Sequence, residues 1–453
     1  MTYIPNSSVT ENHKEHLIPF YPHSNPFPAI VEGKGAQVWD EQGKRYIDCE
    51  AGPGVSNVGH CHSGLVSAIS DQAKRLIHSP GRYVSQLQFS LARRLSELTG
   101  GVLKKTFFVT TGAEATDGAI KLALKYAVLS GKRGFGLIAL QHGFHGRLSL
   151  SSALMGVAKR KRALATYATF PGVVHAPAPY CYRCPFGLTH PSCGLKCADA
   201  VVDLLKTSVP GEAAAMILEP ILGVGGVICP PDGYLEKVRA ICSENKIVLI
   251  VDEVFTGMGR TGKIFAYQHT NALPDILTFA KAAGGGIPIG GFMARQEIAD
   301  AFESGDHSTT MGSSNQIGLA AAQAVVDALH KENLVERAEQ SGLKFKNAII
   351  ALQNGFPFIG DVRGRGLMIG IEIVADKETR EPAADAATEL HEALRQNGLL
   401  VSIAGVLNNV LRITPPLVIS DGEIDECMEI LRRTFEDHKK ASRDAARPQP
   451  KNG

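Results

Sequence analysis

Short, wholly apolar runs alternate with segments of helical periodicity between about residues 50 and 320, and this alternation constrains the fold more than any other feature. The runs are apolar at nearly every position, as in strands that are covered on both faces. Between two of them, residues 115–129 place their apolar side chains on one stripe at helical spacing. Strands that alternate with helices form βα units, so we predict a mainly parallel sheet that includes strands at 106–110, 136–140, 215–218, 247–251 and 276–279.

The pattern changes after about residue 330. One long helix is predicted over residues 316–352, followed by an apolar segment, 359–374, with a Gly-Arg-Gly turn inside it. Another helix and a last apolar run, 410–419, complete a smaller α+β unit. Near the other end of the chain, alternation about a central turn predicts a hairpin over residues 35–48. A chain of 453 residues exceeds one ordinary core, so two structural units are expected.

Composition excludes several classes of partner. The 47 basic and 45 acidic residues nearly cancel, which gives no reason to expect nucleic acid or an anionic membrane. No stretch approaches the roughly 18 apolar residues of a membrane span, and the polar first 20 residues lack the features of a secretory signal. Nine cysteines, an odd number in a long chain, argue against a disulfide scaffold. We therefore expect a soluble, cytoplasmic protein.

Residues that could bind a ligand or take part in a reaction follow three of the predicted strands. A small-residue turn, Thr110-Thr-Gly-Ala-Glu-Ala-Thr-Asp117, opens a helix and offers free amide groups to a phosphate, although it also fits an ordinary βα turn. Asp252 leaves a buried strand, where a pyridinium nitrogen, a helix cap or a structural ion pair would each explain it. Lys281 follows the next strand, beside three glycines, and is either a solvated loop residue or an imine-forming amine. Their order on successive strands is far more specific than any one of them.

Two longer motifs carry a family resemblance. The segments Asp252-Glu-Val-Phe-Thr-Gly-Met-Gly-Arg-Thr-Gly262 and Pro274-Asp-Ile-Leu-Thr-Phe-Ala-Lys281 resemble the signature of the class III (ω-)aminotransferases, which depend on pyridoxal phosphate (PLP). The interval of 29 residues from Asp252 to Lys281 fits as well, and the resemblance extends from about residue 30 to 435. It implies an α/β protein with the PLP-dependent transferase fold of type I. In that fold residues 62–325 form a large domain around a mainly parallel seven-stranded sheet, residues 1–61 and 326–438 form a small α+β domain, and residues 439–453 are a disordered tail.

The resemblance also implies which residues hold the cofactor. Lys281 would form the Schiff base and move protons, and Asp252 would keep the pyridine nitrogen protonated so that the ring withdraws electrons. Phe144 and Val254 would cover the two faces of the ring. The other residues implied to contact the cofactor are Thr111, Gly112 and Ala113 at the phosphate and His145 beside Phe144.

Further positions match substrate and subunit contacts of the family. Glu219 resembles the gate carboxylate and Arg412 the arginine that takes a substrate α-carboxylate, and the two are thought to pair when the substrate lacks that group. A solvated surface cation is the alternative for Arg412. Arg147 matches an arginine that binds a distal carboxylate in 4-aminobutyrate aminotransferases. Thr310 would reach the phosphate of a neighbouring subunit, which implies a homodimer with shared active sites, or a tetramer built from it.

Two positions depart from the family pattern. Phe255 stands where the family commonly has a glutamine that contacts the ring oxygen of the cofactor, so this hydrogen bond is absent and simple transamination is less certain. After Thr310, the usual Gly-Gly-Asn-Pro is replaced by Gly312-Ser-Ser-Asn315, which weakens the predicted contact between subunits.

Four cysteines form a separate cluster in the sequence. Cys181, Cys184, Cys193 and Cys197 have a spacing that would suit zinc or an iron–sulfur cluster, but small buried thiols or two reduced CxxC-like turns explain it too. The central spacer is shorter than in most zinc ribbons. We predict no metal.

The predicted function is PLP-dependent transfer of an amino group from an ω-amino acid or amine, such as 4-aminobutyrate, to a keto acid such as pyruvate or 2-oxoglutarate, by a ping-pong mechanism. A racemase, a decarboxylating transaminase or a phospho-lyase of the same fold remains open, as does a non-catalytic scaffold, against which the intact Lys281 and Asp252 argue. A P-loop is not supported, because Gly257-Met-Gly-Arg-Thr-Gly-Lys263 is followed by Ile264 instead of a hydroxyl residue.

Overall fold

A seven-stranded sheet forms the centre of the computed structural model, which describes residues 28–162, 169–308 and 310–445 together with His16 and Ile18. The strand β10 runs antiparallel to both of its neighbours, and the remaining neighbouring pairs run parallel. The predicted mainly parallel sheet is therefore confirmed. Its strands, in spatial order, are β4 (Lys105–Val109), β10 (Gly290–Ala294), β9 (Ile276–Phe279), β8 (Val248–Asp252), β7 (Ala213–Leu218), β5 (Gly136–Leu140) and β6 (Val173–Ala176).

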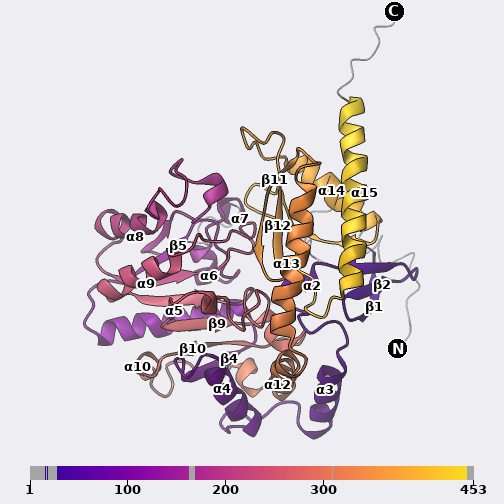
Figure 1. Ribbon diagram of the computed structural model, residues 1–453. Coiled ribbons are helices and arrows are strands. Elements are labelled where there is room, and N and C mark those ends of the chain that lie inside the picture. The colour runs from indigo at the N-terminus through magenta and orange to yellow at the C-terminus, as the bar shows by residue number, and fades with distance from the viewer. Residues whose placement is uncertain (1–15, 17, 19–27, 163–168, 309, 446–453) are drawn as a thin grey trace, which may run out of the picture.

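The strands are buried on both faces, as their unbroken apolar sequences predict. Leu137 and Ala139 of β5 belong to a core that contains residues of α5 (Gly112–Leu129), α6 (Ser149–Leu154) and α10 (Gln296–Ala299). The alternate residues Ile138 and Leu140 belong to a second core with α8 (Lys196–Thr207) and α9 (Tyr234–Glu244). This two-residue alternation places helices on both sides of the sheet (Figure 1).

The sequence motifs did not predict where β6 and β10 lie. The strand β10 begins with two glycines, which are usually rare in strands. Here they are needed, because a Cβ at Gly290 would lie 2.7 Å from the Phe279 carbonyl oxygen and one at Gly291 only 2.5 Å from that of Phe107.

A smaller unit contains two further sheets, and Figure 1 shows them beside α13, α14 and α15. The predicted hairpin is confirmed as β2 and β3, and the Gly-Arg-Gly turn joins β11 to β12. One sheet has the order β1 (Ile30–Lys34), β2 (Gln37–Asp40), β3 (Arg45–Asp48) and β13 (Leu399–Leu400). The other has the order β11 (Ile359–Arg365), β12 (Met368–Ile373), β15 (Val410–Ile413) and β14 (Ser402–Ala404).

Three predicted elements differ from the structure. The single helix predicted over 316–352 is wrong, because α12 (Gln316–Lys331) and α13 (Leu334–Leu352) are separated at Asn333, whose φ of 51° is left-handed. Only the first four residues of the run 410–419 form a strand, β15. The disorder predicted from residue 439 is wrong as far as residue 445, because α15 (Asp421–Ala445) continues to that point, and residues 446–453 lie outside the described part.

The remaining elements are helices and 3₁₀ turns. None of the helices in the described ranges is long and apolar enough to cross a membrane. The predicted cytoplasmic location and the domain boundaries stay predictions. The elements are α2 (Ala51–Gly54), α3 (Ser63–Arg75), α4 (Gln86–Leu98), α7 (Ala158–Lys161), α11 (Met311–Ser314), α14 (Ala384–Gln396) and 3₁₀ turns at Cys181–Arg183, Ala266–His269 and Lys281–Gly284.

Candidate active site

Most of the predicted site residues lie just beyond the carboxyl ends of parallel strands, where ligands bind in open α/β sheets. This edge is reached by successive loops, so residues far apart in the sequence come together. In chain order these residues are Thr111 after β4, Phe144 and His145 after β5, Glu219 after β7, Asp252 at the end of β8 and Lys281 after β9. Arg412 comes from β15 of the smaller unit.

Asp252 is buried and held in one orientation by three donors. Its Oδ2 lies 2.7 Å from His145 Nδ1, and its Oδ1 accepts hydrogen bonds from Thr278 Oγ1 at 3.0 Å and the Val254 amide at 3.1 Å. The carboxylate is thus fixed at the site without a cationic side chain of Lys or Arg bonded to it in these contacts. His145 Nε2 is also buried and has no hydrogen-bond partner within the described residues, which leaves a polar group available to something outside the chain.

The start of α5 lies at the same edge. Thr111 caps the helix, accepting from the Glu114 amide at 3.2 Å, while the Glu114 carboxylate accepts from the amides of Thr110 and Thr111. The amides of Gly112 and Ala113 lie in the first turn, where no acceptor exists inside the helix. A Cβ at Gly112 would lie 2.8 Å from Val254 Cγ1, so glycine is required for this close approach. The turn therefore suits an anion.

Lys281 begins a 3₁₀ turn in a strained conformation, with a left-handed φ of 45° that is rare for a lysine. Burial and the nearby Arg412 lower the pKa of its amine to about 8, although Glu219 and Asp252 act in the opposite direction. A substantial fraction of Lys281 is therefore neutral at physiological pH, as a nucleophile or base requires.

The ring of Phe255 lies beside two cations. Lys281 Nζ is 4.4 Å and Arg412 Cζ 4.9 Å from the ring centre, within the range of cation–π attraction. The edges of the ring are enclosed by two glycines: an added Cβ would lie 2.3 Å from the ring at Gly54 and 2.1 Å from it at Gly223. The departure from the family pattern thus puts an aromatic face where a polar amide was expected.

Glu219 is buried and accepts hydrogen bonds from the amides of Phe144 at 2.9 Å and Gly223 at 3.0 Å. Burial raises the pKa of its carboxyl to about 7. A second carboxyl, that of Glu50, is close enough to Arg412 for the guanidinium to lower its pKa, although burial has the larger, opposite effect and the pKa is raised. The sequence motifs gave no signal for Glu50, because it lies in the smaller unit and belongs to none of them.

Two predicted residues lie further from Lys281. Thr310 caps α11, and its hydroxyl donates to the Phe108 carbonyl at 2.9 Å within the same chain. Arg147 is exposed, with its guanidinium carbon 5.8 Å from the centre of the Phe144 ring, yet its charge still contributes to lowering the pKa of Lys281. Their proposed roles depend on groups outside this chain.

The cysteine cluster is separate from this site. Cys181, Cys184, Cys193 and Cys197 are free thiols, and Cys193 and Cys184 contribute, after burial, to raising the pKa of Cys181. Within the described residues, however, no three or more metal-ligating side chains are grouped so that they could hold a metal ion. Arg260, from the segment that resembles part of a P-loop, is fully buried and donates to the Leu367 carbonyl at 2.9 Å, which is a structural role.

The residues at this edge fit PLP. An oriented buried carboxylate, an anion-binding helix start and a lysine of lowered pKa match a pyridinium nitrogen, a phosphate and an aldehyde, and the unpartnered Nε2 belongs to the histidine whose Nδ1 contacts that carboxylate. The fold and the site thus fit the class of PLP-dependent enzymes. Sequence comparison narrows this further, since residues 21–435 match the family described as Aminotransferase class-III. The chain belongs to the class III aminotransferases, whose cofactor is PLP.

Known members are similar over nearly the whole chain. An acetylornithine aminotransferase of Caldanaerobacter subterraneus is 38% identical over 92% of this chain and 96% of its own. A leucine/methionine racemase of Thermococcus litoralis is 38% identical over 90% of each chain. A solved structure, the (S)-enantioselective omega-transaminase from Thermomicrobium roseum, has 32% identity and a TM-score of 0.90, covering 97% of this chain and all of that one.

Proposed function

We propose that this aminotransferase takes its amino group from an ω-amino acid or a primary amine and delivers it to a keto acid such as pyruvate or 2-oxoglutarate, in a ping-pong cycle. The observation that carries the proposal is the position of Arg412, which lies beside Lys281 but also against the ring of Phe255. Because the guanidinium of Arg412 has an aromatic partner inside the site, this cation keeps a favourable contact when the donor lacks an α-carboxylate. The likeness to an omega-transaminase supports the same donor class.

The residues of the chain have distinct proposed roles. The bound cofactor supplies an electron-withdrawing ring that stabilises negative charge on the substrate carbon. Asp252 keeps the pyridine nitrogen protonated, and His145 and Thr278 hold its carboxylate in place. The amides of Gly112 and Ala113, with Thr111, bind the phosphate, while Phe144 and Val254 cover the ring faces.

Lys281 has two proposed tasks. Its neutral amine would hold the cofactor, and once a substrate amine took that place, the freed Lys281 amine would act as the base that accepts and carries the proton of the substrate carbon. Arg412 and Arg147 bind carboxylates of the amino donor or the keto acid. Glu219 is the proposed gate carboxylate beside them.

Lys281→Ala tests the central assignment. The variant should lose the absorbance band of the lysine-bound cofactor and at least about a thousandfold of turnover, since both the covalent link and the proton carrier are gone. Absorbance spectra and steady-state rates measure this. Near-native turnover in the alanine variant would refute the assignment.

The donor class follows from one absorbance experiment on PLP-loaded protein without keto acid. 4-Aminobutyrate, β-alanine, L-alanine and a simple primary amine are each added in turn. Conversion of the cofactor band by 4-aminobutyrate, β-alanine or the simple amine supports the proposal, and conversion by L-alanine alone contradicts the donor class. If none converts the band, the racemase related to this chain sets the next assay, which is loss of optical activity from L-leucine and L-methionine.

A homodimer with shared sites is part of the proposal. Apolar side chains are exposed along residues 77–89, among them Tyr83 at 71% and Val84 at 79%. This segment is joined to the Thr310 region, because the Gln316 amide donates to the Ile77 carbonyl at 3.1 Å and that of Ser79 to Ser314 at 2.9 Å. Patches of this kind mark protein interfaces. A second copy docked here would bring its Thr310 towards the phosphate site.

A further inference from the structure

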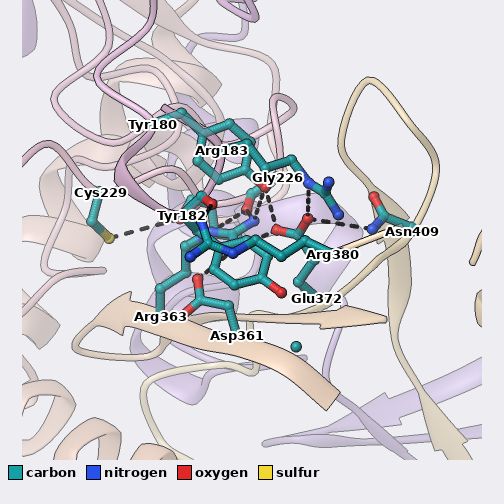
Figure 2. Close-up of polar contacts among 12 residues, drawn as sticks. Tyr180, Tyr182, Arg183, Gly226, Cys229, Asp361, Arg363, Glu372, Arg380 and Asn409 are labelled. Atoms are coloured by element: carbon teal, nitrogen blue, oxygen red, sulfur yellow. Dashed lines mark hydrogen bonds and ion pairs between the residues drawn. The ribbon is translucent and has the colours of Figure 1, made fainter. Parts of the chain in front are cut away.

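A buried network of charges joins the two structural units behind the active site. Figure 2 shows Tyr180, Tyr182 and Arg183 of the large unit meeting the side chains of β11 and β12. At its centre, the fully buried Glu372 accepts from Arg183, Arg363 and Tyr180. Burial alone would raise the pKa of Glu372, but these donors hold it below its ordinary value. The Glu372 carboxylate is therefore ionised and paired with its donors.

Arg363 uses every nitrogen of its guanidinium. Nη1 donates to Asp361 at 2.7 Å and to Glu372 at 2.6 Å, while Nη2 also reaches the Tyr180 hydroxyl at 3.0 Å. The other edge of the guanidinium, formed by Nε and Nη2, donates to backbone carbonyls of another loop. Nε and Nη2 donate to the Gly226 carbonyl at 3.0 and 2.6 Å, and Nε also to the Val227 carbonyl at 3.1 Å. Only a planar fork of donors can make these contacts together.

The loop whose Gly226 and Val227 carbonyls bind Arg363 has a strained backbone. Val227 has a φ of 55°, and a β-branched residue in this left-handed region is a clear outlier. Such a conformation persists only where the surroundings enforce it. The two carbonyl contacts of Arg363 flank the φ and ψ rotations of Val227, so the guanidinium is placed to enforce it.

The strained residue supports the active site directly. The Val227 side chain is fully buried in a cluster with Ile221, Phe255 and Met368. Phe255 in turn lies 4.4 Å from Lys281 Nζ and 4.9 Å from Arg412 Cζ. A path thus leads from Arg363 to Val227, through the buried cluster that Val227 shares with Phe255, and from the Phe255 ring to the proposed reacting lysine.

We propose that Arg363 is a positioning residue for the amino-transfer reaction: its guanidinium holds Val227 in the left-handed conformation, and Val227 holds the Phe255 ring against Lys281 and Arg412. The inference rests on the proposed role of Lys281. It assigns a catalytic effect to a residue that touches neither cofactor nor substrate.

Arg363→Lys tests this with Arg183→Lys as its matched control. Both variants keep a positive charge next to Glu372, but lysine has three donors and cannot make the six hydrogen bonds of Arg363 together. Arg183 makes no hydrogen bond to Gly226 or Val227 within the described structure. We expect Arg363→Lys to lower kcat about 10- to 100-fold, as misplacement of about 1 Å does, and Arg183→Lys to change it less than about threefold. Equal effects of the two variants would overturn the proposal.

Two further readouts separate positioning from general damage. The pH at which the cofactor band of the loaded protein titrates should shift by about 0.3 unit or more in Arg363→Lys but not in Arg183→Lys, because the ring over Lys281 moves. In a Val227→Gly background, Arg363→Lys should cost less than about threefold, because glycine lacks the buried side chain through which the effect would pass and adopts a φ of 55° freely. A full cost in that background would exclude the route through Val227.

If Arg363→Lys does not fold, Asp361→Asn takes its place. This isosteric change at a partly exposed side chain removes one carboxylate that holds Nη1. It should lower kcat at least about threefold with a nearly unchanged melting temperature, and unchanged kcat would overturn the proposal. Conversion of the cofactor band by wild type and Arg183→Lys is required first. Its absence would count against the proposed function, not against the role of Arg363.

Discussion

Desolvation by burial is the largest cause of the lowered pKa of the Lys281 amine. Its nearest charges are mixed, since Arg412 and Arg147 lower the pKa while Glu219 and Asp252 raise it, and burial tips the balance. The backbone contributes too, because a left-handed φ aims the side chain in a direction that an ordinary strand end would not. Its surroundings thus give Lys281 the lowered pKa that its proposed role as a nucleophile requires.

The rate of PLP capture by cofactor-free protein should therefore rise with pH about a midpoint near 8. The neutral amine is the nucleophile, and an ordinary lysine would not lose its proton until about pH 10.4. The sign for stability follows from the same shift. As pH falls from about 10.4 to about 8, the unfolded chain binds this proton first, so the cofactor-free protein loses stability across that window. Stopped-flow absorbance gives the midpoint, and a value above about 9.5 would contradict the lowered pKa.

The positions of single residues in the fold could be predicted where a strand pattern in the local sequence comes just before them. Asp252 and Lys281 end consecutive strands of the structure, β8 and β9, so their proximity follows from the order of apolar runs. Glu50, Thr278 and Val227 were missed, because their importance depends on what the chain brings next to them. Nothing in the sequence marks Val227 as strained, since an apolar β-branched residue is ordinarily read as a core residue, and Val227 does lie in the buried cluster with Phe255.

At the scale of elements, the break between α12 and α13 shows how periodicity alone misleads. The apolar spacing continues from one helix to the other, but the chain turns at Asn333, whose φ is 51°. Asparagine tolerates this conformation better than most residues. A different backbone constraint explains β10. Its two glycines are of a type usually rare in strands, but they are required because neighbouring backbone leaves no room for a Cβ.

Substitutions at Asn333 test this reading of the break. Asn333→Gly should leave stability unchanged or slightly higher, whereas Asn333→Val should lower it by about 1–2 kcal/mol, since a β-branched side chain clashes in the left-handed region. Chemical denaturation followed by circular dichroism measures both. Equal stability of the two variants would show that the backbone does not stay left-handed at this position.

The molecule as a whole was predicted better than its parts. A mainly parallel sheet buried on both faces follows from the order of apolar runs, and the same order predicts a site at its carboxyl edge. The proposed completion of the site by a second copy, docked on residues 77–89, also belongs to this scale.

Tyr83→Glu and Val84→Glu, made together, should convert the proposed dimer to a monomer and weaken PLP binding about tenfold or more, since a shared Thr310 contact would be lost. Leu273→Glu, exposed at the amino end of β9, is the matched control and should change neither property. Sedimentation velocity and cofactor titration measure the two effects. A wild-type protein that sediments as a monomer would refute the shared site.

The enclosure of Phe255 by Gly54 and Gly223 has a consequence for redesign. The ring occupies the volume that two Cβ atoms would need, so the size of the side chain at position 255 limits the side chains that fit at positions 54 and 223. Room for bulkier amines has to come from shortening position 255, because the other two are already as small as they can be. Once the ring is gone, alanine becomes sterically available at positions 54 and 223, although both would still have to suit the backbone, and Gly54 has a φ of 70°. A library that varies Phe255 alone would therefore sample only part of the pocket shapes that this scaffold permits.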